Sequence, residues 1–285
     1  MLSMLVCTDG SPVARTAVRY ARHLAEAMGL QVRVLFVEDV RHTQGPLLTG
    51  YYGPVGMAPS PAYPAFYDEL VKAVKEQGER AVQEAREVFE GSSASVEYVV
   101  REGIVRDCIL DEARTVDLVC MGRRGEHEEW EEDELGGTAE RVIRRSARPV
   151  LVTPAEFREI SKMLMAYDGS RGANRALRTA LALASDHDLP MVIVTVSPDD
   201  DARPRYERIL EEARELASAW KDVELEFLML VGETEEQVLT EAAATHECQL
   251  IVMGAYGESR IREWLMGSTT AAVLAHASLP VLLVR

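Results

Sequence analysis

The sequence predicts an α/β protein in two similar halves, each with a doubly wound, five-stranded parallel sheet. Short runs rich in valine, isoleucine and leucine alternate with segments of helical periodicity, which is typical of a parallel sheet with helices on both faces. The same series of elements is found twice along the chain. A length of 285 residues suits two domains that each bury a core of their own.

The repeat begins with an apolar strand that ends in Asp-Gly-Ser, at Asp9 in the first half and Asp168 in the second. A helix and a second strand follow in both halves. The number of residues from Asp9 to Val37 equals the number from Asp168 to Val196. A repeat that keeps its register through strand, helix and strand indicates duplication of one domain.

The first helix of each half has recognisable start and stop signals. Ser11 can cap the helix in the first half, and Pro12 suits its first turn. Gly29 is expected to end that helix, and residues 188–190, Asp-Leu-Pro, are expected to end its counterpart.

The remaining elements follow in the same order in both halves, so each half is predicted to be β-α-β-α-β-α-β-α-β. Each closing strand begins with a proline, which cannot donate to a strand ladder. The predicted ranges after the first helix are 32–37, 67–90, 96–100, 104–113, 116–121 and 149–152 in the first half, and 191–196, 206–220, 225–230, 235–244, 249–253 and 280–284 in the second.

The first half carries an insertion, residues 41–67, that is rich in glycine, proline and tyrosine. The second half has only a short segment there. Two interpretations stay open: a surface linker, or a lid or partner surface that uses the aromatic side chains for contact. With this loop included, the domains are expected to span 1–155 and 160–285.

Composition excludes several classes of partner. The net charge is −16 and the isoelectric point is near 4.9, which disfavours nucleic acid and anionic membranes. No apolar run reaches the roughly 20 residues of a membrane span, and the N-terminal residues lack the features of a signal peptide. A cytoplasmic location is expected.

Four cysteines lie in apolar patterns without any C-x-x-C pair: Cys7, Cys108, Cys120 and Cys248. We expect free, buried thiols in a reducing compartment. None of the six histidines falls in a metal-ligand spacing such as H-E-x-x-H, so no metal site made of protein side chains is predicted.

The segment 253–270 carries the clearest functional signal. A buried strand ends in Gly254, and Gly257 and the pair Gly267-Ser268 follow, in the spacing G-x2-G-x9-G-S. Glycines let a backbone approach a ligand closely, and the start of a helix offers N–H groups at its positive end. Such a turn is suited to binding phosphate groups.

A second copy of this turn lies in the first half. It contains Gly122, Gly125 and Gly137-Thr138, with two more residues in the intervening loop. In a doubly wound sheet, ligands bind beyond the carboxyl ends of the strands, where the strand order reverses. The Asp-Gly-Ser turn and the glycine turn of each half are therefore expected to flank one crevice.

With these motifs in both halves, the whole chain resembles a tandem universal stress protein. The resemblance rests on the strand ending in Asp-Gly-Ser, the valine of the second strand, and the glycine signature of that family. It implies an adenine nucleotide alpha hydrolase-like, Rossmann-like fold with strand order 3-2-1-4-5. It also implies ATP or ADP as the bound cofactor, with Mg²⁺ left open, and packing of the two domains through their closing strands, 150–152 and 281–283.

In the second half, the resemblance implies that Asp168 and Val196 contact the adenine and ribose, and that Ala166 lines the base pocket. The residues implied to border or hold the ribose and phosphates are Met253, Gly254, Tyr256, Gly257, Gly267, Ser268 and Thr269. The corresponding first-half positions are Cys7, Asp9, Val37, Met121, Gly122, Arg124, Gly125, Gly137, Thr138 and Ala139.

Structural alternatives stay open at these positions. The two aspartates could be turn residues before a helix, and the glycines could serve turn geometry alone. The first-half loop, 126–134, is strongly acidic and would repel a triphosphate unless Mg²⁺, Arg123 or Arg124 compensates. The second-half loop instead offers Arg260 and Arg262, which makes it the better candidate.

Three functions are consistent with this sequence. The leading hypothesis is a stress-response or regulatory protein in which ATP acts as a conformational ligand. The alternatives are a slow ATP-hydrolysing enzyme, and a partner-binding scaffold whose first-half site is degenerate. The P-loop motif G-x4-G-K-[ST] is missing from both halves, and no residue stands out as a base or nucleophile. Binding of a protein partner, or formation of a homodimer, is left open.

Overall fold

The computed structural model describes residues 2–41, 63–125, 136–255 and 267–285, without the side chains of 63–67. The first half contains β1 (Ser3–Cys7), α1 (Pro12–Met28), β2 (Gln31–Asp39), α3 (Tyr63–Val88), β3 (Val96–Gly103), α4 (Val105–Ala113), β4 (Leu118–Gly122), α5 (Gly137–Arg145) and β5 (Val150–Thr153). The second contains β6 (Met163–Ala166), α6 (Arg171–His187), β7 (Met191–Ser197), α7 (Arg203–Ala217), β8 (Leu225–Val231), α8 (Glu235–Thr245), β9 (Leu250–Gly254), α9 (Ser268–His276) and β10 (Val281–Val284).

The strands in the described part of the chain form one ten-stranded sheet with the order β3-β2-β1-β4-β5-β10-β9-β6-β7-β8. Each half therefore has the order 3-2-1-4-5, and every pairing within a half is parallel. The predicted fold class is confirmed. Because consecutive strands in a half are parallel, each connection must cross over the sheet, and a helix does so.

The two halves join through their closing strands. β5 and β10 pair antiparallel, with Leu151 opposite Leu282. The expectation that the closing strands pair is confirmed, and the result is a mixed sheet rather than two separate parallel ones. The pairing also covers one edge of each half, so that only β3 and β8 lie at the ends of the sheet.

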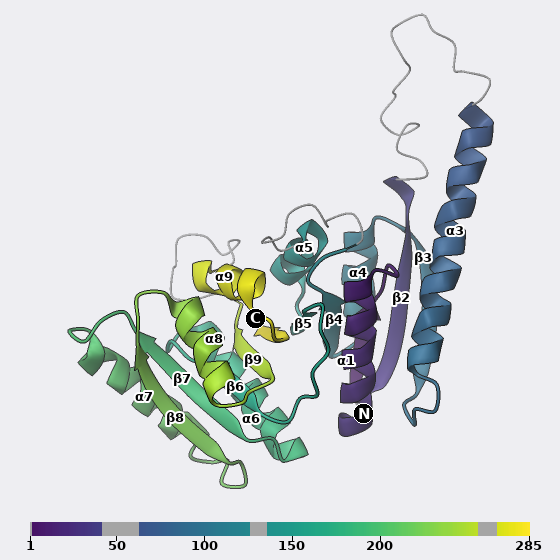
Figure 1. Cartoon of the computed structure of the whole chain (residues 1–285). Helices are drawn as coiled ribbons and strands as arrows, with labels where there is room; N and C mark the ends of the chain where they lie inside the picture. Colours follow the sequence, from purple (N-terminus) through teal and green to yellow (C-terminus); the bar gives the residue numbers. More distant parts are fainter. Residues whose placement is uncertain (1, 42–62, 126–135, 256–266) are drawn as a thin grey trace, which may run out of the picture.

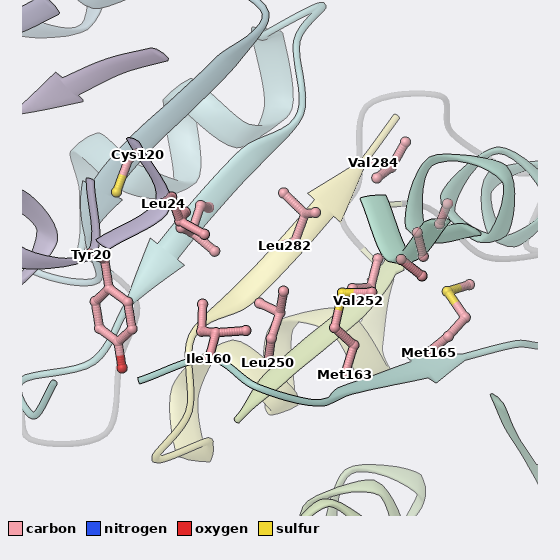
Figure 2. Close-up of a cluster of buried hydrophobic side chains, with 14 of the residues drawn as sticks. Tyr20, Leu24, Cys120, Ile160, Met163, Met165, Leu250, Val252, Leu282 and Val284 are labelled. Carbon is pink, nitrogen blue, oxygen red and sulfur yellow. The ribbon is translucent and has the colours of Figure 1, made fainter. Parts of the chain in front are cut away.

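Helices cover both faces of this sheet (Figure 1). The buried residues form two clusters, one under α1, α3, α6 and α7 and the other under α4, α5, α8 and α9. The first cluster is continuous across the junction: Figure 2 shows Tyr20 and Leu24 of α1 in the same cluster as Leu282 of β10 and Met163 of β6. The halves therefore share a core as well as a sheet.

The predicted helix signals are confirmed. The Ser11 side chain accepts a hydrogen bond from the Ala14 N–H at 3.2 Å, and the Ser170 side chain accepts one from the Ala173 N–H at 3.0 Å. Gly29 ends α1 in the left-handed conformation with a φ of 63°. Asp188 takes the same conformation at the end of α6, with a φ of 52°.

Several element boundaries differ from the prediction. α7 begins at Arg203, three residues before the predicted start, because Pro204 fits the first turn of a helix. β3 continues to Gly103, since it pairs with β2 as far as Asp39. α3 begins inside the range predicted as an insertion, at Tyr63, and residues 42–62 lie outside the described part of the chain.

Among the described helices, α3 differs most in length from its counterpart in the other half. It has 26 residues, whereas its counterpart α7 has 15. Figure 1 shows α3 extending beyond the tip of β2, at the edge of the sheet where the strands of the first half end. Among the described residues, no helix is both long enough and apolar enough to cross a membrane.

Candidate functional site

The candidate sites lie where the strand order reverses. In the first half β1 lies between β2 and β4, and in the second half β6 lies between β7 and β9. Asp9 follows β1 and Asp168 follows β6, while the glycine turns follow β4 and β9. Each Asp-Gly-Ser turn is thus a neighbour of a glycine turn at the carboxyl edge of the sheet, as the sequence predicted.

Each aspartate makes the same local hydrogen bond. Oδ1 of Asp9 accepts from the Ser11 N–H at 2.9 Å, and Oδ1 of Asp168 accepts from the Ser170 N–H at 2.9 Å. Each aspartate therefore does act as a turn residue, because this hydrogen bond orients the start of the following helix. It occupies one oxygen of each carboxylate, and the second oxygen of the exposed Asp168 can accept from another group.

In the first half that second oxygen faces the glycine turn. A Cβ atom added to Gly125 would lie 3.0 Å from Oδ2 of Asp9. Only a residue without a side chain lets the backbone lie this close to the carboxylate. The structure thus brings together two residues predicted for the site that are more than a hundred positions apart in the sequence. Their counterparts in the second half are Asp168 and Gly257, and Gly257 lies outside the described residues, as does Tyr256.

The first glycine of each turn has a different purpose. A Cβ atom added to Gly254 would lie 2.8 Å from the carbonyl carbon of Gly172 and 2.9 Å from the nitrogen of Ala173. A Cβ atom on Gly122 would lie 2.9 Å from Cγ1 of Val13. These glycines let the ends of β9 and β4 touch the first turns of α6 and α1, so helix packing explains them without any ligand.

The N-caps of α5 and α9 show which glycines of the two motifs are equivalent. The N-cap of α9 is Gly267, and the N-cap of α5 is Gly136, one residue before the glycine paired with it in sequence. Gly137 and Thr138 are thus equivalent to Ser268 and Thr269. The first-half loop is longer by one residue, and the predicted difference of two was wrong.

The start of α9 is suited to an anion. The first N–H groups of a helix have no acceptor within the helix, and the N-cap glycine has no side chain to supply one. Oγ1 of Thr270 donates to the Gly254 carbonyl at 3.2 Å, which ties the helix start to the end of β9. Oγ1 of Thr269 donates to a carboxylate oxygen of Glu235, the first residue of α8. These two contacts hold the first turn of α9 next to the glycine turn.

The apolar side chains among the residues predicted to bind the nucleotide are buried or half-buried. Cys7, Met121, Val196 and Met253 are buried, and Val37 and Ala166 are half-buried. Burial, with a smaller effect of the nearby Asp9 carboxylate, raises the pKa of the Cys7 thiol to about 12. Cys7 is therefore a neutral wall residue at physiological pH. All four cysteines are free and buried, as predicted.

The other predicted residues are more accessible. Asp168 and Ser268 are exposed, and Asp9, Gly122, Arg124, Gly125, Gly137, Thr138, Gly254, Gly267 and Thr269 are half-buried. Ala139 is the exception, since only 2% of its surface is exposed. It packs into the core beneath α5, so only its backbone could reach a ligand.

The Arg123 side chain contacts the other half of the chain. Its Nη1 donates to the carbonyl oxygens of Leu274, Ala275 and Ala277, at 2.9, 2.7 and 3.1 Å. These carbonyls belong to the end of α9 in the other half. Arg123 is therefore used at the junction, and the acidic loop lies outside the described residues.

Sequence patterns did not predict the contacts of four residues in this region: Gln77, Arg123, Glu235 and Thr270. Gln77 of α3 donates from Nε2 to the Asp9 carbonyl at 3.1 Å and so links α3 to the Asp-Gly-Ser turn of the first half. No periodicity distinguishes such a residue from other polar residues on a helix. Of the four, Thr270 alone could have been found from the sequence, as a threonine in the first helical turn after Gly-Ser.

The described residues contain no group of three or more histidine, cysteine, aspartate or glutamate side chains able to hold a metal ion. A cavity of about 400 Å³ lies away from the glycine turns, between α1, the end of α3 and the segment joining the halves. Its lining mixes arginines with glutamates, and it contains none of the residues predicted to bind a ligand.

Comparison with known proteins gives a consistent result. The model of the universal stress protein family matches residues 1–154 and 159–285. The chain is similar to universal stress protein Slr1230 of Synechocystis, with 32% identity over 293 residues that cover 100% of both proteins. It is also 26% identical to universal stress protein Rv1996 of Mycobacterium tuberculosis, over 100% of this chain and 95% of the relative.

Solved structures show the same likeness in the fold. The crystal structure of a universal stress protein from Archaeoglobus fulgidus is similar with a TM-score of 0.72 at 20% sequence identity, covering 99% of this chain and 96% of that one. A universal stress protein solved in complex with cAMP matches 44% of this chain and 97% of its own, with 29% identity and a TM-score of 0.38.

Proposed function

The chain belongs to the universal stress protein family, as two family domains in tandem, and on that premise we propose that it binds adenine nucleotides as regulatory ligands. The second half is the main site in this proposal, and ATP or ADP is its ligand. The observation that carries the proposal is the meeting of Asp168, Gly254 and the start of α9 at the point where strand order reverses.

The residues present fit an adenine nucleotide. Ala166, Val196 and Met253 give an apolar wall against which a base can pack. Asp168 keeps one carboxylate oxygen beyond its turn hydrogen bond, and this oxygen can accept from the adenine amino group or a ribose hydroxyl. The start of α9, with Ser268 and Thr269, offers N–H and O–H donors to phosphate oxygens.

This arrangement favours holding the nucleotide over cutting it. The chain has no P-loop lysine, and the described residues at the turn include no histidine that could act as a base. Mg²⁺, where it accompanies ATP, would be bound chiefly through the phosphates, since that ion usually keeps few protein ligands. Binding would stabilise the glycine loop and the start of α9, and so change the surface available to a partner.

The test is titration calorimetry of the full chain with ATP, ADP and cAMP, with and without Mg²⁺. Asp168→Asn keeps an oxygen for the Ser170 N–H but removes the charge, so the turn is preserved. We expect ATP affinity to fall about tenfold or more, as for loss of a charged hydrogen-bond acceptor. The matched variant Asp9→Asn should have a smaller effect, because the first-half loop is acidic.

Two outcomes would contradict the proposal. One is the absence of any nucleotide binding by the unsubstituted chain, confirmed by mass spectrometry of the denatured protein without co-purified ATP or ADP. The other is unchanged affinity in both aspartate variants. Steady phosphate release that disappears in Asp168→Asn would favour the enzyme alternative instead.

A further inference from the structure

The end of α9 carries a contact that crosses between the halves. One guanidinium nitrogen of Arg123 donates to three carbonyl oxygens, those of Leu274, Ala275 and Ala277. The last carbonyls of a helix have no partner within the helix and carry its negative end. Arg123 therefore satisfies them and places a positive charge where the helix dipole favours one.

Arg123 is itself held firmly in the first half. Its N–H donates to the Thr153 carbonyl of β5 at 3.0 Å, and its carbonyl accepts from the Gly136 N–H at 3.0 Å. Thr153 is at the end of β5 and Gly136 is the N-cap of α5. The backbone of Arg123 thus joins the end of β5 to the start of α5 beside the first-half glycine turn, and its side chain reaches from there into the second half.

On the other side of the junction, the contact with the helix end comes from a different position. The residue equivalent to Arg123 is Ala255, which makes the matching backbone bond to the Val284 carbonyl at 2.8 Å. Its methyl side chain has no group that could donate to the carbonyls of α5. The end of α5 instead receives a longer bond, from Nη1 of Arg285 to the Arg144 carbonyl at 3.5 Å. The two helix ends are therefore contacted from different positions, because Arg123 lies beside the glycine turn of its half, whereas Arg285 follows β10.

We propose that Arg123 is a positioning residue for the nucleotide site of the second half. This inference rests on the proposed function, because the start of α9 is the phosphate end of that site. α9 has only nine residues, so its two ends are one rigid unit. A cation at its end and an anion at its start both favour the same orientation of the helix, and each should strengthen the other.

The consequence is that the first half sets phosphate affinity in the second. Movement of the first-half glycine turn would move Arg123 and relax α9, without any ligand atom touching Arg123. The effect should be confined to ligands with phosphate groups, because Arg123 acts through α9 and α9 faces the phosphates in this arrangement. Adenosine binding depends on the apolar wall and Asp168, which Arg123 does not contact.

The experiment measures ATP and adenosine affinities of full-length Arg123→Met and Arg123→Lys, in an Asp9→Asn background that weakens the first-half site. We expect Arg123→Met to weaken ATP binding about threefold to tenfold and to leave adenosine binding unchanged. Arg123→Lys should restore most of the ATP affinity, since an ammonium group can also donate to several carbonyls. The control Arg285→Met removes the side chain that reaches the Arg144 carbonyl at the end of α5. It should leave both affinities unchanged.

Three results would overturn the inference. Unchanged ATP affinity in Arg123→Met would exclude the coupling, and equal losses for ATP and adenosine would indicate general damage to the fold. No rescue by Arg123→Lys, with normal thermal unfolding of that variant, would also contradict it. If the unsubstituted chain binds neither ATP nor adenosine, the proposed function fails as well, which separates that failure from loss of the coupling alone.

Discussion

At the scale of single residues, the two aspartates show how one side chain can have a structural and a functional role. Oδ1 of Asp9 and of Asp168 orients the serine that caps the next helix, at 2.9 Å in both halves. The serine in turn satisfies an N–H group of the first turn. The same Asp-Gly-Ser sequence therefore builds the helix start and presents a carboxylate at the carboxyl edge of the sheet.

Cys7 allows a prediction about pH. Its pKa is raised in the folded protein, from 9.0 to about 12, by burial first and then by Asp9. A group with a raised folded pKa stabilises the fold below its unfolded pKa, and this contribution is lost as pH rises. Between pH 9 and pH 11 the unfolding free energy should fall by up to about 1.4 kcal/mol per pH unit from this thiol.

Chemical denaturation across that range would measure this slope. Cys7→Ala should show a shallower decline than the unsubstituted chain. Val6→Ala, a neighbouring buried position without a titratable group, should lower the whole curve and keep the slope. Identical slopes for the unsubstituted chain and Cys7→Ala would contradict the assignment.

At the scale of elements, the strand ends and helix starts fit only because certain positions lack side chains. Gly254 at the end of β9 is in contact with the backbone of Gly172 and Ala173 at the start of α6. For a Cβ atom added to Gly122 at the end of β4, the nearest atom is Cγ1 of the Val13 side chain in α1 at 2.9 Å, and the nearest backbone atoms lie at 3.3 Å. A backbone neighbour cannot move aside without shifting a whole helix, whereas a side chain can adjust.

Gly254→Ala should therefore destabilise the protein more than Gly122→Ala. We expect a loss of about 1–3 kcal/mol for Gly254→Ala, in the range for overpacking, and a smaller loss for Gly122→Ala. Urea denaturation of the two variants measures the difference. Equal losses, or a larger loss at Gly122, would show that the contact with α6 is not the reason for the glycine.

At the scale of the whole molecule, the halves are one folded unit. They share a ten-stranded sheet through the antiparallel pair β5 and β10, and one buried cluster is continuous across the junction (Figure 2). Leu151 and Leu282 face each other in this pair, and both are almost fully buried. Arg123 adds a polar contact between the halves.

Leu282→Asp should separate the halves. It would bury an unpaired carboxylate opposite Leu151, which costs several kcal/mol. We expect two unfolding transitions in calorimetry in place of one, and a larger hydrodynamic radius. Leu282→Met, which nearly conserves volume, should cost less than about 1.5 kcal/mol and keep a single transition. A single, unshifted transition for Leu282→Asp would show that the junction is not needed for cooperativity.

The sequence by itself determined the order of elements, the duplication, the helix caps and the positions of the glycine turns. These depend on local conformation and on hydrophobic periodicity, which neighbouring residues report directly. The family resemblance also implied that the last strands pair, and both are apolar enough to cover each other's edge.

Only the tertiary structure decided which of these features meet. It places Gly125 beside Asp9, packs Gly254 against α6, shifts the first-half N-cap to Gly136, and directs Arg123 to α9. Periodicity says that a residue is buried or exposed but not which distant element covers it. That depends on strand order and on the antiparallel junction, which bring residues together over more than a hundred positions of chain.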